Sequence, residues 1–295
     1  MARTNIISAT SASITHQADE GSIGAILVEA GRLNPEDAER ILSFQREQGL
    51  RFGEAGTALG VLSQADIDFA LTRQFDYAHV QYHDNQLHEM VIAAHAPYDR
   101  PAEALRAVRS ELLLRWFDAH VGHKMLAVIS AARQEGRSFV AANLAVVFSQ
   151  LGEHTLLVDS DMRSPCQHGL FGIENRVGLS NMLSARVGRE ALQRISGLPR
   201  LSVLPAGARP PNPLELLSRP AFPRLLQDLA EDFDVIILDT PPAAFFADAQ
   251  TVAARAGAAL IVARQNTSRI SELRLVSDAA TRAGAAVLGT VLNQF

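Results

Sequence analysis

The sequence predicts an α/β protein in which a doubly wound, mostly parallel sheet is preceded by a small helical domain. After Lys124, six short apolar runs alternate with helical segments, and nearly continuous apolar strands are typical of parallel sheets covered on both faces. A loop containing glycine, a basic residue and serine follows the first run. Near the N-terminus, two stretches of 24 residues repeat each other, which predicts two similar helical units.

The bulk composition fits a protein of about two domains. Of the 295 residues 47% are hydrophobic and 20% are charged, and the formal net charge of −5 does not favour nucleic acid as a partner. The single cysteine, Cys166, excludes an internal disulfide and suits a reducing compartment. No apolar run approaches the roughly 20 residues that span a bilayer, and residues 1–21 lack a signal-peptide core and read as a disordered leader. We therefore expect a cytoplasmic protein.

Residues 22–74 are the predicted helical repeat domain. Its two units align at an offset of 29 residues, which places Gly31 opposite Gly60. Each unit reads as helix, glycine, helix, and glycine is well suited to end a helix. Two such helical hairpins stacked together can bury one small core.

The α/β domain is expected over residues 101–295, after a connector with a short strand at 75–100. A helix is expected to begin at Pro101. The expected strands cover residues 125–130, 155–159, 201–205, 234–239, 258–263 and 286–292. Because ligands of such sheets bind at the carboxyl ends of the strands, the residues that follow these strands are the candidates for a functional site.

The loop 131–138, AARQEGRS, has the outline of a phosphate-binding loop. Backbone N–H groups of such a loop and of the following helix point at phosphate, and the helix dipole favours the anion. Relative to the pattern G-x-x-x-x-G-K-[ST], Ala131 replaces the first glycine and Arg137 replaces the lysine, while Ser138 is retained as a Mg²⁺ ligand. The candidate nucleotide-binding residues here are Arg133, Gln134, Glu135, Gly136, Arg137, Ser138 and Phe139.

Acidic residues end two further strands. Asp159 and Asp161 alternate at the end of LLVDSD and are followed by Arg163, and Asp239 ends VIILD. Asp239 at this place suits the ordering of Mg²⁺ through water. Each aspartate alone could equally be a helix cap or a turn residue. Together with the loop, in this order on an α/β pattern, they favour a nucleotide site.

These motifs resemble those of the bacterial tyrosine kinases. LLVDSDMR resembles their second Walker motif, VIILDTPP resembles their Walker B motif, and Glu103, Arg106 and Arg109 resemble the E-x-x-R-x-x-R motif through which they form rings. Asn293 resembles an asparagine that meets the adenine in related ATPases. The resemblance covers about residues 100–295. It is strongest to the exopolysaccharide chain-length-determinant kinases often called EpsG-type, in which arginine can replace the loop lysine.

The resemblance implies transfer of the γ-phosphoryl group of ATP to a tyrosine hydroxyl, which depends mainly on positioning and electrostatics. Either Asp159 or Asp161 would be the base near the incoming hydroxyl, and the other would contact Mg²⁺. The expected metal ligands are Ser138, Asp161 and Asp239, with Arg137 in place of the lysine and with Arg163 and Asn293 in the nucleotide site. The resemblance also implies a P-loop fold of the ParA/MinD kind, a homo-oligomer and a membrane-bound polysaccharide co-polymerase. That partner would recruit the protein to the inner face of the membrane.

The sequence leaves other functions open. The tyrosines, Tyr77, Tyr82 and Tyr98, all precede the loop, so we do not expect phosphorylation of a C-terminal tyrosine cluster. Together with the altered loop, this allows a catalytically silent, nucleotide-binding or oligomeric regulator of polysaccharide export. A positioning ATPase of the ParA/MinD kind is a further alternative, although Ala132 stands where such proteins carry a second lysine. Charges three residues apart on a helix also commonly form a solvated face.

The N-terminal repeat resembles the N-terminal domain of type II secretion and pilus ATPases, the MshEN type, whose pattern binds cyclic di-GMP. The second unit keeps Arg51, Gly53, Gly60 and Gln74, whereas Ser22 replaces the arginine in the first unit. The resemblance therefore implies a cyclic di-GMP site at these four residues. Because guanidinium groups are the natural partners of phosphate, the loss of one arginine favours the alternative, a helical module that docks another protein.

Overall fold

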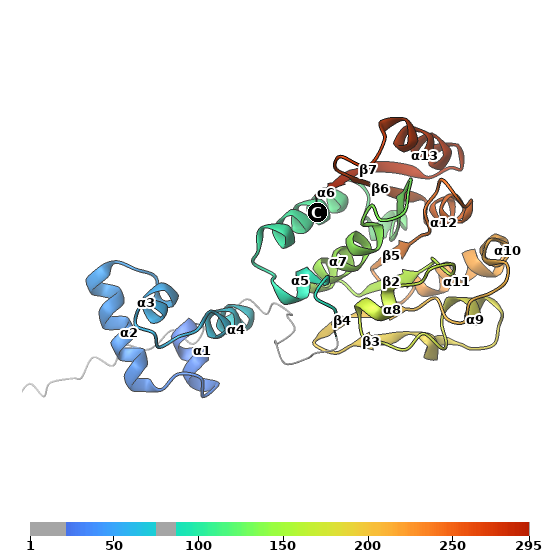
Figure 1. The fold of residues 1–295 in the computed structure, drawn as a ribbon. Coiled ribbons are helices and arrows are strands. Elements are labelled where there is room, and N and C mark those ends of the chain that lie inside the picture. The colour runs from blue at the N-terminus through green and yellow to red at the C-terminus, as the bar shows by residue number, and fades with distance from the viewer. Residues whose placement is uncertain (1–21, 75–86, 295) are drawn as a thin grey trace, which may run out of the picture. The chain divides into compact units, whose positions relative to one another are not determined.

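The computed structural model describes residues 22–74 and 87–294, which are coloured in Figure 1. The chain divides into two compact units, with the division between Tyr77 and Ala78. The expected leader, 1–21, and residues 75–86 of the expected connector lie outside the described residues. Within the described ranges, no helix is long and apolar enough to cross a membrane.

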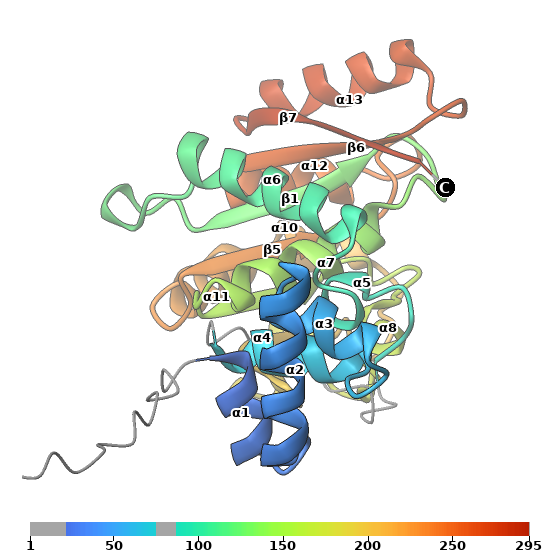
Figure 2. The same cartoon turned by 90° about the vertical axis from the view of Figure 1, so that its left-hand side faces the viewer.

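The first unit consists of helices at the spacing of the sequence repeat. The helices are α1 (Ile23–Glu29), α2 (Pro35–Gln48), α3 (Phe52–Ala58) and α4 (Gln64–Gln74). Gly31 and Gly60, which follow α1 and α3, both adopt left-handed backbone, with φ of 68° and 66°, so each glycine ends its helix as the sequence indicates. The four helices, blue to cyan in Figure 2, surround one small core that includes Leu33 and its repeat partner Leu62.

The second unit is built on a seven-stranded sheet in the order β3-β4-β2-β5-β1-β6-β7. The strands are β1 (Met125–Ser130), β2 (Thr155–Asp159), β3 (Gln193–Ile195), β4 (Leu198–Leu204), β5 (Val235–Asp239), β6 (Ala258–Arg264) and β7 (Ala286–Asn293). All neighbours are parallel except β3 and β4, which are antiparallel. The predicted doubly wound, mostly parallel sheet is confirmed. β3 was not predicted because it is a three-residue edge strand of which only Ile195 is buried.

Both faces of the sheet are covered, which explains the continuous apolar runs. Successive residues of one strand enter different cores, as Leu126 lies in one and Ala127 in the other. Helices α5 to α8 pack on the face that contains Leu126, and helices α9 to α13 pack on the face that contains Ala127. The bounds of these helices are α5 (Ile92–His95), α6 (Arg100–Arg115), α7 (Arg137–Gln150), α8 (Gln167–Leu170), α9 (Leu179–Leu183), α10 (Pro213–Ser218), α11 (Ala221–Leu229), α12 (Asp248–Ala256) and α13 (Ile270–Arg282). Short 3-10 turns cover Ala119–Val121 and Arg189–Ala191.

The described part of the expected connector, residues 87–99, belongs to the second unit and contains the short helix α5 instead of a strand. It is held by α7, since Asn143 Oδ1 accepts a hydrogen bond from Ala93 N (2.9 Å) and Gln150 Nε2 donates one to the Ala93 carbonyl (2.8 Å). Both amide side chains are buried on α7. The expected short strand is not found in residues 87–99, and the rest of the expected connector lies outside the described residues. The contacts that hold α5 come from residues about 50 positions away, which a local pattern does not register.

Candidate nucleotide-binding site

The loop between β1 and α7 has the backbone shape of a phosphate-binding loop. Gly136, with φ of 89°, is the N-cap of α7, and the 14-residue helix begins at Arg137. The carboxylate of Glu135, which is 1% exposed, accepts a hydrogen bond from Ala132 N (2.6 Å) and one from the Ser268 hydroxyl. These bonds fix the loop, so the N-terminus of α7 is presented to an anion by a rigid frame.

Gln134 carries backbone strain within this loop. Its φ of 61° lies in the left-handed region, which costs a residue other than glycine about 1–2 kcal/mol. Its carbonyl accepts a hydrogen bond from Arg264 Nη1 (3.3 Å). The side chain is exposed, so its identity matters less to the loop than its backbone conformation.

We expect Gln134→Gly to raise the free energy of unfolding by about 0.5–1 kcal/mol, because glycine adopts this φ without strain but loses more entropy on folding. Urea unfolding of the full chain measures the change. Gly136→Ala makes the reverse change in the same loop, because it adds a side chain at a residue with left-handed backbone. We expect it to lower the free energy of unfolding by about 1 kcal/mol. Equal effects of the two substitutions would show that the loop is not held in this conformation.

Three aspartates converge at the carboxyl ends of β2 and β5. Asp159 and Asp239 are direct register partners across these parallel strands, and Asp161 follows two residues after β2. Asp159 and Asp239 are fully buried and Asp161 is 4% exposed. The sequence predicted that these strand ends would meet, and the structure brings all three carboxylates together with the loop.

Arg137 supplies the positive charge of this cluster. Its guanidinium, on the first residue of α7, lies 3.5 Å from Asp161 Oδ2 and 3.5 Å from Asp239 Oδ1. Arg137 Nη1 also donates a hydrogen bond of 2.7 Å to Ser130 Oγ. Arg137 is only 8% exposed. In this arrangement the residue in the lysine position turns back onto the carboxylates.

Asp159 and Asp161 differ in the groups that their carboxylate oxygens contact. Asp159 Oδ2 accepts hydrogen bonds from Cys166 N and Gln167 N, both at 3.0 Å, and Asp159 Oδ1 accepts one from Asp161 N at 3.2 Å. Asp161 Oδ1 accepts bonds from Arg163 N (3.1 Å) and Ser164 N (2.9 Å), which leaves Oδ2 facing Arg137. Asp159 therefore organises the loop after β2, whereas Asp161 keeps one oxygen toward the site.

Asp239 is bound by side chains. Its Oδ2 accepts a hydrogen bond of 2.8 Å from Gln167 Nε2, which also donates to the Ser138 carbonyl (3.1 Å). The Ser138 hydroxyl hydrogen-bonds the same carboxylate and lowers the pKa of Asp239. Sequence reasoning missed Gln167 and Ser130. Ser130 could have been found as the last residue of the predicted first strand, but no local signal marks Gln167.

Burial dominates the electrostatics of the cluster. Burial raises the pKa of Asp159 well above its usual range, and the neighbouring charge of Asp239 raises that pKa further. Burial also raises the pKa of Asp239, partly offset by Arg137. Burial and the same carboxylates raise the pKa of the Cys166 thiol to about 12, so Cys166 is not an activated nucleophile. The cluster contains three buried carboxylates and one guanidinium, which lies against Asp161 and Asp239, so it is short of positive charge.

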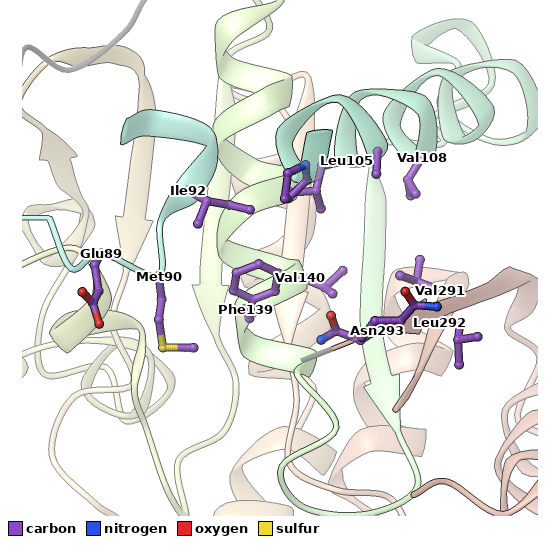
Figure 3. A pocket seen from close by; sticks show the side chains of 13 residues that line it. Glu89, Met90, Ile92, Leu105, Val108, Phe139, Val140, Val291, Leu292 and Asn293 are labelled. Carbon is purple, nitrogen blue, oxygen red and sulfur yellow. The ribbon is translucent and has the colours of Figure 1, made fainter. Parts of the chain in front are cut away.

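A cavity of about 710 Å³ opens beside the start of α7. In Figure 3, Phe139 lies on α7 between Met90 on one side and Asn293 on the other. Leu105 and Val108 of α6 line the same cavity, whose walls are mostly apolar. Asn293 Nδ2 donates a weak hydrogen bond of 3.4 Å to the Glu135 carbonyl. The predicted residues Phe139 and Asn293 therefore meet at one cavity, directly after the loop.

The side chains of two predicted nucleotide-site residues do not lie in the carboxylate cluster. Arg133 is exposed. The Arg163 guanidinium pairs with Asp248 through Nε–Oδ1 (3.2 Å) and Nη2–Oδ2 (3.1 Å), and its Cζ atom lies 4.0 Å from the centroid of the Phe246 ring. Only the backbone N–H of Arg163 reaches the carboxylate cluster.

The residues expected to form an oligomer interface lie on α6. Arg106 pairs with Glu103 (2.6 Å) and donates to the Pro97 carbonyl, and Arg109 Nη1 donates to the Val147 carbonyl on α7 (2.7 Å). The motif thus has internal contacts as well as an exposed Glu103. Its role in assembly stays a prediction.

The residues expected to bind cyclic di-GMP in the first unit have structural contacts of their own. Arg51 precedes α3, and its backbone N–H donates to the Glu54 carboxylate (2.9 Å). A side chain at Gly53 would meet Ile67 at 3.2 Å, and Gly60 ends α3 with left-handed backbone. A cavity of about 690 Å³ in this unit is lined by residues such as Gly24, Gln45 and Phe52, and by none of Arg51, Gly53 and Gly60. The side chain of Gln74 lies outside the described part.

Comparison with known proteins relates the chain to tyrosine kinases. No family model matches the chain. The tyrosine-protein kinase YwqD of Bacillus subtilis (strain 168) is 33% identical over 209 residues, which cover 71% of this chain and 87% of YwqD. The tyrosine-protein kinase wzc of Salmonella typhimurium is 33% identical over 213 residues, 72% of this chain but 29% of that longer protein.

Solved structures agree with the sequence comparison. The kinase domain of Escherichia coli tyrosine kinase ETK is 30% identical, covers 73% of this chain and 84% of that domain, and has a TM-score of 0.67. The chimerical protein CapA2B2 is 32% identical over 70% of this chain and 91% of its own, with a TM-score of 0.65. The cell division ATPase MinD of Pyrococcus furiosus is 26% identical over 58% of this chain and 71% of its own, with a TM-score of 0.51. The expected MinD-like P-loop fold is thereby confirmed.

Proposed function

Because the chain belongs to the bacterial tyrosine kinase family, we propose that it binds ATP with Mg²⁺ and transfers the γ-phosphoryl group to a tyrosine hydroxyl of a protein. The observation that carries this proposal is the convergence of the loop, the N-terminus of α7, three buried carboxylates and an apolar cavity at one end of the sheet. A phosphate-binding loop, acidic strand ends and a base-sized cavity are the parts that a nucleotide site needs.

The cavity fits the base and ribose of the nucleotide. Its volume of about 710 Å³ is within the usual range for small-ligand pockets. Phe139 and Val140 place it next to Ser138, where the phosphates would meet the helix N-terminus. The Asn293 amide, at the end of β7, can donate to or accept from a base edge. We therefore assign the phosphates to Gly136–Ser138 and the base to the cavity.

The carboxylate cluster fits a divalent cation. Within the described part of the chain, Asp239 Oδ1 and Gln167 Oε1 are buried without a hydrogen-bond partner, and oxygen atoms are the ligands that Mg²⁺ prefers. Asp239 and Ser138 would hold the ion, in part through water, with Gln167 Nε2 fixing the Asp239 carboxylate. When bound, Mg²⁺ would neutralise charge on the phosphate oxygens.

The acceptor hydroxyl needs a carboxylate to receive its proton. Asp159 is poorly suited because both of its oxygens are held by backbone N–H groups. Asp161 Oδ2 is oriented toward Arg137 and the loop. We therefore assign the base to Asp161, the organisation of the loop to Asp159, and contact with the outer phosphates to Arg137 after it separates from the carboxylates.

The biological setting follows from the family in the same way. We propose that the protein acts in exopolysaccharide biosynthesis and export, at the inner face of the membrane, with a membrane-bound co-polymerase as partner. Homo-oligomerisation through Glu103, Arg106 and Arg109 is part of this proposal, as is the EpsG-type character of Arg137. A membrane partner and a ring assembly would be tested by co-purification and by sedimentation.

A silent regulator is the second candidate. It is favoured by the buried contacts of Arg137 with Asp161 and Asp239, which hold the basic residue away from the loop surface. The strained Gln134 and the buried Ala131 also depart from the usual loop. Such a regulator would bind nucleotide without turning it over, or would act only through assembly of the oligomer.

We expect titration of the full chain with ADP and ATP to show binding that requires Mg²⁺. Asn293→Ala should weaken ADP binding roughly fivefold, because one hydrogen bond contributes about 1 kcal/mol. Leu275→Ala, an exposed change on α13, is the control and should leave ADP affinity within twofold. No binding at millimolar ATP would reject the nucleotide site. Binding without transfer to a tyrosine copolymer would instead favour the silent regulator.

A further inference from the structure

The loop between β5 and α12, residues 240–247, carries two adjacent aromatic side chains at the edge of the proposed site. Its backbone is attached to the phosphate-binding loop, since Ala243 N donates to the Ser130 carbonyl (2.9 Å) and Ala244 N to the Ala131 carbonyl (3.0 Å). Phe245 and Phe246 follow directly. The position of this aromatic pair is therefore fixed relative to the start of the loop.

Phe246 is held from the other side by Arg163. The Arg163 guanidinium stacks on the Phe246 ring at 4.0 Å and pairs through two nitrogens with Asp248, which is 1% exposed. The backbone N–H of Arg163 donates to Asp161 Oδ1 (3.1 Å). Phe246 is thus joined to Asp161 through a single residue.

The side chain of Phe245 is mostly exposed and is not part of either core of this unit. It is 62% exposed, and its ring centroid lies 6.4 Å from that of Phe246, with the planes tilted by 53°. Burial of this phenylalanine side chain would stabilise the fold, and its exposure on a loop whose backbone is fixed forgoes that stabilisation. A tilted ring pair at this spacing leaves an open aromatic face, onto which a third ring can pack edge to face.

We propose that Phe245, supported by the stack of Phe246 on Arg163, is a positioning residue that receives the ring of the acceptor tyrosine. The occupant is a tyrosine-bearing segment of another protein chain, which would place its hydroxyl toward Asp161. This inference rests on the proposed phosphoryl transfer, in which that hydroxyl attacks the γ-phosphorus, the bond to the ADP oxygen breaks and Asp161 takes the proton. The aromatic contact gives the site a preference for tyrosine over serine and threonine.

The same observations favour this occupant over a second copy packed through its own Phe245. The exposed ring of Phe245 lies beside the Phe246 ring, which is itself covered by a guanidinium already paired with Asp248. It therefore offers one ring-sized apolar contact instead of an extended apolar surface. A single aromatic contact of this kind is suited to a side chain that must bind and leave.

The test measures peptide binding and nucleotide binding separately on the full chain. A fluorescein-labelled peptide with one tyrosine is titrated in the presence of saturating ADP and Mg²⁺, and ADP affinity is measured on the same samples. We expect Phe245→Ala to weaken peptide binding about five- to tenfold, Phe245→Tyr to retain it, and ADP affinity to stay within twofold in both. If turnover is detected, Phe245→Ala should raise the KM for the peptide with little change in kcat. Leu275→Ala is the control for loss of exposed apolar surface on α13.

Unchanged peptide affinity in Phe245→Ala would overturn the proposal, as would wild-type protein that binds ADP but no tyrosine peptide. Equal binding of a matched serine peptide would also overturn it. A change in oligomeric state by sedimentation, with peptide affinity preserved, would assign Phe245 to a contact between copies. Failure of the wild-type protein to bind ADP would instead reject the proposed function, which separates the two conclusions.

Discussion

Replacing Arg137 with alanine is expected to abolish Mg²⁺-dependent nucleotide binding and to lower the free energy of unfolding by about 3–5 kcal/mol, because removal of one member of a buried ion cluster leaves charges without compensation. Arg137 is the cation that lies against the buried Asp161 and Asp239. Urea unfolding and ADP titration measure the two effects. Added Mg²⁺ should recover stability in Arg137→Ala more than in the wild-type protein, since it supplies the missing positive charge.

Two variants control this prediction. Arg137→Lys keeps the charge but loses the planar fork, so we expect less than half of the destabilisation and retained nucleotide binding. Arg133→Ala removes an exposed arginine from the same loop and should change stability by no more than about 0.5 kcal/mol. Wild-type stability in Arg137→Ala would mean that the carboxylates are already neutral, and the ion cluster described above would then be wrong.

Replacing Asp159 with alanine is expected to be the most damaging single change at the ends of the strands, at about 3–5 kcal/mol. Its carboxylate accepts hydrogen bonds from the backbone N–H groups of Asp161, Cys166 and Gln167. A buried donor without a partner costs about 1–3 kcal/mol, and loss of repulsion from Asp239 offsets part of the sum. Guanidinium or urea unfolding checks the magnitude.

The matched comparison is Asp161→Ala, which removes acceptors from two partly buried N–H groups and should cost only about 1–2 kcal/mol. Asp159→Asn should be milder than Asp159→Ala. The amide oxygen of asparagine still accepts hydrogen bonds. Because the amide is neutral, it also avoids the cost of burying a charge, which raises the pKa of Asp159. Greater damage from Asp161→Ala than from Asp159→Ala would contradict the division of roles between the two residues.

Much of the fold could be predicted because its signals are local. β1 and β2 begin and end at the residues predicted from apolar runs, since a strand covered on both faces needs apolar residues at every position. The helix starts of the first unit recur at the repeat offset for a similar reason, with glycine required where the backbone is left-handed. The candidate residues of the loop and of the acidic strand ends could also be found, because parallel strands bring their carboxyl ends to one edge.

Other features depend on contacts between distant parts of the chain, and the sequence did not predict them. β3 forms by pairing with the edge of β4. The short helix α5 is held in place by Asn143 and Gln150 of α7. The apolar cavity is formed jointly by α6, α7 and β7. No periodicity in any one of these segments indicates a cavity.

The residue pattern alone was enough to predict the α/β sheet, the helical repeat and the strand ends at which acidic and basic side chains gather. The role of each of those side chains became clear only from its contacts in the folded chain. Asp159 and Asp161 are two residues apart and chemically identical, yet backbone N–H groups bind both oxygens of Asp159 and only one oxygen of Asp161, whose other oxygen faces Arg137. Apolar patterns report burial along a segment, whereas the partner of a polar group is chosen by hydrogen-bond geometry among segments that meet only in the folded chain.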